Sequence, residues 1–144
     1  MPIGEDIPLL IPISIILVVF IVFLVSLFSN FIDQNEVVRM SQTSITTGNY
    51  FIELFSDEKG SLVLEELNRH NSCKNKCCNF KSFGFYSNFK TNVKIESGGV
   101  YWCWSNVNSK YDTSPEKRIV NSFPVLIADG YETEVGKVTV GVWK

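Results

Sequence analysis

Four cysteines are the residues of this chain whose type and spacing are best suited to chemistry. Cys73, Cys77 and Cys78 lie close together, and Cys103 follows much later. An even number of cysteines in a small domain favours disulfides. A bridge between adjacent Cys77 and Cys78 is strained, which disfavours the pairing of Cys103 with Cys73. We therefore predict that Cys103 pairs with Cys77 or Cys78, closing a loop that stabilises the domain by roughly 3–4 kcal/mol.

Two other states of the cysteines stay open from the sequence. Zinc could be held by the four thiolates, or by three of them with His70. However, C-x3-C-C with one distant cysteine differs from the paired knuckles of structural zinc sites. Reduced thiols in a cytosolic domain are the second alternative. We predict disulfides, with no metal and no cofactor.

The remaining polar residues form no recognisable catalytic site. A Ser–His–Asp or Cys–His arrangement would have to use His70, the only histidine, and no nucleophile elbow accompanies it. No P-loop, GxGxxG or HExxH motif occurs. Asp129, Glu132 and Glu134 offer oxygen ligands for calcium, but their spacing matches no standard calcium loop. The sequence therefore predicts a protein that is not an enzyme.

Charge excludes one class of partner and leaves a second open. The formal net charge of −2 gives no nucleic-acid footprint, so we predict no nucleic-acid partner. From Leu67 to Ile95 the charged residues are all basic. We interpret this stretch as a solvated loop face, with contact to lipid headgroups or to an acidic polymer as the alternative.

A long uncharged run near the N-terminus predicts the element that anchors the rest of the chain. No Asp, Glu, Lys or Arg occurs from Ile7 to Ile32. Because about 20 apolar residues cross a bilayer as a helix, we predict a transmembrane helix over 7–28, after a short tail of residues 1–6. The run is longer than the apolar part of a cleaved signal peptide, and no basic residue precedes it.

Two observations indicate on which side of the membrane the C-terminal domain lies, and they disagree. Arg39 is the one basic residue near either flank, which places the domain in the cytoplasm by the positive-inside rule. The cysteines favour an oxidising compartment. We expect a single-pass protein of the cell membrane with an extracytoplasmic C-terminal domain.

Helical spacing of apolar residues continues beyond the predicted membrane segment. We predict that the helix extends to about Met40 and that a linker completes residues 29–45. The stripe either packs on its own domain or contacts neighbouring subunits. The candidates for helix interaction are Phe28, Phe31, Ile32 and Val38.

Residues 46–144 have the pattern of a small β-rich domain. Gly98 and Gly99 predict a hairpin turn, and the string DGYETEVG predicts a long hairpin loop. The fold class is therefore α+β, with one long N-terminal transmembrane helix followed by a small antiparallel β-rich domain. The segments rich in strand formers are 50–55, 83–86, 92–95, 100–104, 123–128 and 137–143, whereas 61–67 fits a strand or a helical turn.

This arrangement resembles that of archaeal type IV pilin-like proteins. The matching parts are the uncharged helix 7–28, its extension to about Met40, and the ending SFPVLIADGYETEVGKVTVGVWK, which is similar to the closing hairpin of small members. The resemblance covers the plan of the whole chain. It implies a membrane-anchored surface protein that serves as a minor filament subunit. Its partners would be the lipid bilayer and copies of itself or other membrane subunits.

One alternative function keeps the same anchor. The chain could be an accessory single-pass subunit of a membrane protein complex, with the helix as its docking surface.

Overall fold

The computed structural model describes residues 7–71, 77–107 and 118–144, so the expected tail of residues 1–6 lies outside it. The chain has two compact units, residues 1–37 and 38–144, and helix α1 belongs to both. The predicted α+β layout is confirmed. The elements in order are α1 (Ile7–Phe55), β1 (Leu62–Val63), α2 (Leu64–His70), β2 (Cys78–Asn79), η1 (Phe80–Phe83), β3 (Lys90–Ser97), β4 (Val100–Ser105), β5 (Arg118–Asp129) and β6 (Glu132–Trp143).

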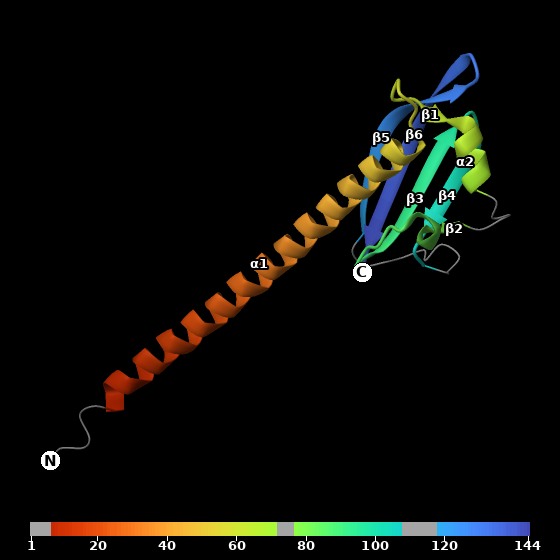
Figure 1. Ribbon diagram of the computed structural model, residues 1–144. Coiled ribbons are helices and arrows are strands. Elements are labelled where there is room, and N and C mark those ends of the chain that lie inside the picture. Colours follow the sequence, from red (N-terminus) through yellow and green to blue (C-terminus); the bar gives the residue numbers. More distant parts are fainter. Residues whose placement is uncertain (1–6, 72–76, 108–117) are drawn as a thin grey trace. The chain divides into compact units, whose positions relative to one another are not determined.

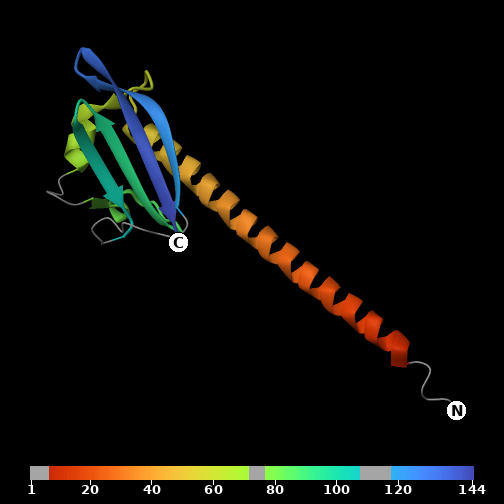
Figure 2. The ribbon, with the colours of Figure 1, turned by 180° about the vertical axis from the view of Figure 1, so that it is seen from behind.

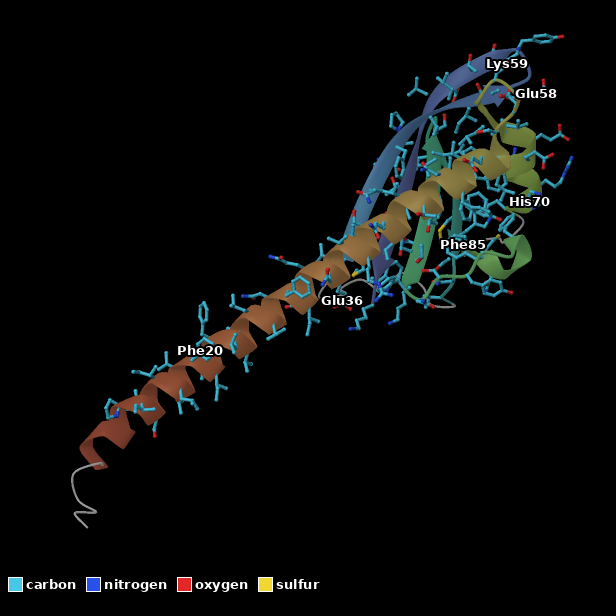
Figure 3. The ribbon with its side chains drawn as sticks, turned by 60° about the vertical axis from the view of Figure 1, so that its left-hand side comes forward. Phe20, Glu36, Glu58, Lys59, His70 and Phe85 are labelled. Carbon is cyan, nitrogen blue, oxygen red and sulfur yellow. A yellow bond between two sulfur atoms is a disulfide. The ribbon has the colours of Figure 1, made fainter. Side chains whose placement is uncertain are left out.

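The first unit consists of the N-terminal part of α1. Its uncharged run from Ile7 to Ile32 is about 39 Å long at 1.5 Å per residue, more than the hydrocarbon thickness of a bilayer. Among the described residues, α1 is the one helix long and apolar enough to cross a membrane. Figure 3 shows side chains, Phe20 among them, that project from the helix in all directions.

A charge near the middle of this run should disturb membrane insertion. We expect Val19→Arg to cost about 2.5–3.5 kcal/mol, because a guanidinium at the centre of a bilayer loses its hydration. An insertion assay that places acceptor sites for glycosylation on both sides of α1 measures the inserted fraction. Val19→Leu is the control and should insert like the natural chain. Equal insertion of the two variants would mean that Val19 lies outside the hydrocarbon.

In the second unit α1 continues without interruption to Phe55, which corrects two predictions. Residues 41–45 are helical and not a linker, and residues 50–55 are helical and not a strand. The reason lies in tertiary packing, which overrides weak helix propensity. Six residues of one helical face are buried against the sheet: Met40, Ser44, Thr47, Gly48, Phe51 and Phe55.

The second unit is built on one six-stranded sheet with the order β1-β5-β6-β3-β4-β2. The four long strands β5, β6, β3 and β4 pair antiparallel, as predicted. The two short edge strands pair parallel, β1 with β5 and β2 with β4. The sheet is therefore mixed and not purely antiparallel, because short segments from outside the hairpins close both edges (Figure 1).

One face of the sheet forms the core. Val138, Val140 and Val142 alternate along β6 on this face and are fully buried, as their spacing predicts. The hydroxyl of Ser44 in α1 donates a hydrogen bond of 3.2 Å to the carbonyl oxygen of Val140. Seen from behind, the opposite face of the long strands is covered by none of the helices that the structure describes (Figure 2).

Glycines set the two hairpin turns. Gly98 and Gly99 both have positive φ and join β3 to β4, as predicted. The β5–β6 loop is much shorter than the predicted long loop, since the strands extend to Asp129 and Glu132. Gly130, with φ of 62°, is the first of its two loop residues, a position that favours glycine in tight hairpins.

The predicted strand at residues 83–86 is absent. Phe83 ends the 3₁₀ helix η1, and no strand begins before Lys90. Phe83 and Phe85 instead direct their rings toward the aromatic core around Phe51, at centroid distances of 5.8 and 6.5 Å. Aromatic residues at this spacing favour a strand in the sequence, but here their rings hold a loop against the aromatic core.

Candidate functional site

The structure exposes the predicted helix-interaction residues. In the first unit, Phe28, Phe31 and Ile32 are each more than 60% exposed. In the second unit, Val38 is 52% exposed, whereas Met40 two residues later is buried against the sheet. The alternative that the stripe packs on its own domain is therefore wrong for Val38, because the opposite side of the helix makes that contact.

The cysteine prediction is confirmed where the structure describes it. A disulfide joins Cys77 to Cys103, with a Cα–Cα distance of 4.6 Å. Cys78 is also disulfide-bonded. Cys73 lies outside the described residues, so its pairing with Cys78 stays a prediction. None of the described cysteines is a free thiol, because Cys77, Cys78 and Cys103 are all disulfide-bonded.

The bridge is positioned by strand pairing. In β2, Cys78 lies beside Trp104 of β4, so the preceding Cys77 comes next to Cys103. Cys103 is buried in the middle of β4, within a strand that pairs with β3 along its length. The disulfide therefore ties a very short edge strand and its loop to the body of the sheet.

The side chain of His70 is 42% exposed and lies at the edge of the aromatic core. Its ring lies 5.2 Å from the ring of Phe83 and 5.9 Å from that of Phe55. Its Nε2 atom is 3.6 Å from a carboxylate oxygen of Glu66, one helical turn earlier in α2. The carbonyl oxygen of His70 accepts a hydrogen bond of 3.4 Å from the indole of Trp104. These contacts anchor the end of α2.

The carboxylates of the β5–β6 hairpin do not form the considered calcium site. Glu134 accepts a hydrogen bond of 3.0 Å from the hydroxyl of Ser97. Asp129 and Glu132 are exposed at the turn. Within the described parts of the chain, no group of three His, Cys, Asp or Glu side chains is placed to hold a metal ion.

Two lysines shift the titration of Glu96 on the face of the sheet away from α1. Lys94 bonds to its carboxylate, and Lys137 lies 3.4 Å from the other oxygen. The bond from Lys94 is the main reason why the pKa of Glu96 lies below its ordinary value of 4.5. Of the basic stretch noted in the sequence, Lys94 and Arg69 are thus ion-paired within the domain.

This pKa shift predicts a small pH dependence of stability. A lowered folded-state pKa means that the charged Glu96 stabilises the fold above pH 4.5, and that this contribution disappears as the pH falls through the folded value. Glu96→Gln should reduce the free energy of unfolding at neutral pH by less than about 1 kcal/mol, because the pair is solvent-exposed. Urea unfolding at neutral pH measures this loss, and unfolding in strong acid shows whether the loss disappears. If the variant were still less stable than the natural chain in strong acid, its effect would not come from the charge of Glu96.

A polar groove in the second unit was not predicted from the sequence. It has a volume of about 340 Å³ and lies between α1 and the loop of residues 85–89. From α1 it is lined by Arg39, Gln42, Thr43 and Thr46, whose spacing places them on one helical face. That spacing was visible in the sequence. The loop that faces it was not, because the two segments are far apart along the chain.

Neither a family model, a curated protein nor a solved structure matches this chain. The exposed helix, the disulfide and the polar groove are therefore the features from which a function can be inferred.

Proposed function

We propose that this chain is a non-enzymatic, membrane-anchored surface protein whose helix α1 both holds it in the bilayer and contacts neighbouring subunits. The observation that carries the proposal is the exposed apolar surface around α1. Large hydrophobic side chains from Ile13 to Ile32, apart from the less exposed Leu24, are about half exposed or more on every side of the helix. A surface of this kind requires lipid or protein around it.

Lipid alone does not account for the whole surface. The hydrocarbon core accommodates about 20 helical residues, which the predicted segment 7–28 already provides. Exposed hydrophobic residues continue past Asp33, with Val38 52% and Ile45 45% exposed in the second unit. A protein partner along this part of α1 would cover them.

The composition of the membrane segment favours a particular type of contact. Residues 7–28 contain no Gly and no Ala, which disfavours the close backbone approach of GxxxG pairs. Bulky Leu, Ile, Val and Phe side chains suit looser bundling of several helices. Such bundling is what a minor pilin-like filament subunit would need, in agreement with the resemblance noted in the sequence.

The disulfide supports an extracytoplasmic domain. Disulfides persist in oxidising compartments and are rare in the cytosol, with intracellular proteins of hyperthermophiles as the exception. The bridge between Cys77 and Cys103 therefore favours the external orientation over the one indicated by Arg39. A lone basic residue is a weak determinant of orientation.

Photo-cross-linking at Phe31 tests the proposed contact. A photoreactive phenylalanine analogue at this position leaves the native cysteines in place. In native membranes it should capture copies of the chain or defined partner subunits. The same analogue at Leu126, which is also half exposed but lies on β5, is the matched control and should capture far less.

The products distinguish the proposal from its alternatives. A ladder of homo-oligomers supports the filament subunit. Capture of one other membrane protein in constant ratio supports the accessory subunit of a complex. If Phe31 yields only monomer while the Leu126 position captures a partner, the helix is a tether and the proposal is wrong.

A further inference from the structure

The polar groove of the second unit has properties of a ligand site. Among the described residues that line it, Arg39 is the only charged one, so this part of the lining carries one positive charge and no acid. Among the described residues the guanidinium of Arg39 has no ion-pair or hydrogen-bond partner. The other arginines of the domain differ, since Arg69 pairs with Glu66 and Arg118 lies over the ring of Trp143.

Further hydrogen-bonding groups line the same groove. The side chains of Gln42, Thr46, Tyr86 and Asn88 make no hydrogen bond within the described parts of the chain. Each can donate to an oxygen atom of a ligand. A guanidinium with amides and hydroxyls around it suits a phosphate group, because the planar fork of arginine binds two of its oxygens at once.

The wall of the groove opposite α1 is held in place. The ring of Phe85 packs with its centroid 5.3 Å from that of the Tyr50 ring. The backbone N–H of Phe89 donates to the hydroxyl of Ser87 at 3.1 Å. The side-chain amide of Asn106 donates to the carbonyl oxygen of Phe89 at 2.7 Å. The loop therefore presents its polar groups from a fixed backbone.

The position of Arg39 along the chain indicates where the phosphate would come from. Only six residues lie between it and Ile32, the last residue of the uncharged run. Arg39 is therefore close along the chain to the point where the uncharged run ends, and the layer next to the hydrocarbon holds the lipid headgroups. The long side chain of arginine lets its guanidinium reach polar groups several ångströms from the helix axis. Tyr86, which lines the groove and is 85% exposed, is a residue type enriched at membrane interfaces.

We propose that this groove binds the phosphate of a membrane phospholipid headgroup through Arg39, with Gln42 and Thr46 on the phosphate oxygens. The inference rests on the proposed membrane anchor. Headgroup binding would fix the orientation of the domain above the bilayer, which a single helix leaves free to rotate.

The test uses the full chain in detergent micelles and native mass spectrometry. The probes are phosphatidylglycerol, digalactosyldiacylglycerol, which has two acyl chains but no phosphate, and inorganic phosphate. Phosphatidylglycerol should be retained preferentially. Arg39→Gln should reduce its retention about tenfold, the effect expected for loss of a charge-assisted hydrogen bond. Arg69→Gln removes the same charge outside the groove and should leave retention unchanged.

Each other outcome overturns the inference in a recognisable way. Equal retention of the glycolipid would mean that the groove does not select phosphate. Equal retention of inorganic phosphate would assign the groove to a soluble anion. If Arg69→Gln also lowered the retention of phosphatidylglycerol, the effect of Arg39→Gln would be explained by net charge alone. Failure of the anchor itself is distinguishable, because the chain would then stay in the aqueous fraction of broken cells.

Discussion

Replacement of Phe51 by alanine should unfold the β-rich domain more readily than any other single change considered. Phe51 is fully buried, and its ring lies 5.5 Å from Trp104 and 5.3 Å from Phe80. Removal of a buried phenylalanine ring leaves a cavity and costs about 3–5 kcal/mol. Denaturant unfolding of the full chain in micelles measures the loss. Tryptophan fluorescence reports it, because Trp104 is buried beside the missing ring.

The matched control lies on the other side of the same helix. Ile45 is 45% exposed, so Ile45→Ala changes a side chain of α1 without opening a core cavity. Its loss of unfolding free energy should stay below about 1 kcal/mol. Similar losses for the two variants would contradict the packing of the 38–55 part of α1 on the sheet.

Loss of the Cys77–Cys103 disulfide is the second large effect. The bridge spans 26 residues, and replacement of both cysteines by alanine should lower the free energy of unfolding by about 3–4 kcal/mol in the chain-entropy model. Alanine is preferred to serine because Cys103 is buried and a hydroxyl there would need a partner. Denaturant unfolding without reductant provides the measurement.

Reduction of the natural protein supplies an independent comparison. A reductant should destabilise the natural chain at least as much as the double replacement, because Cys78 is also disulfide-bonded. A loss below about 1 kcal/mol in the double variant would show that the bridge does not restrict the unfolded chain.

The parts of the fold that were predictable have local causes. The membrane segment follows from the absence of charge between Ile7 and Ile32. The hairpin β3–β4 follows from strand formers on both sides of Gly98 and Gly99. The bridge from Cys103 to the cysteine loop follows from the strain of a vicinal pair, although the sequence left Cys77 and Cys78 equivalent.

The parts that were missed depend on contacts between distant segments. Residues 41–49, SQTSITTGN, are poor helix formers, and only burial of Ser44 and Thr47 against the sheet explains their helical state. The parallel pairing of β1 with β5, and of β2 with β4, joins segments that no local sequence pattern connects. The polar groove likewise forms only when the loop 85–89 meets α1.

Labelling of intact cells with a membrane-impermeant thiol reagent reports directly on which side of the membrane the disulfide-bonded domain lies. If the chain is a single-pass protein with this domain outside the cytoplasm, untreated cells should show no labelling. Cys77 and Cys103 should then be labelled after an impermeant reductant and a mild denaturant are added. Labelling that requires cell breakage would place the domain in the cytoplasm, and labelling without the reductant would show that the thiols are free.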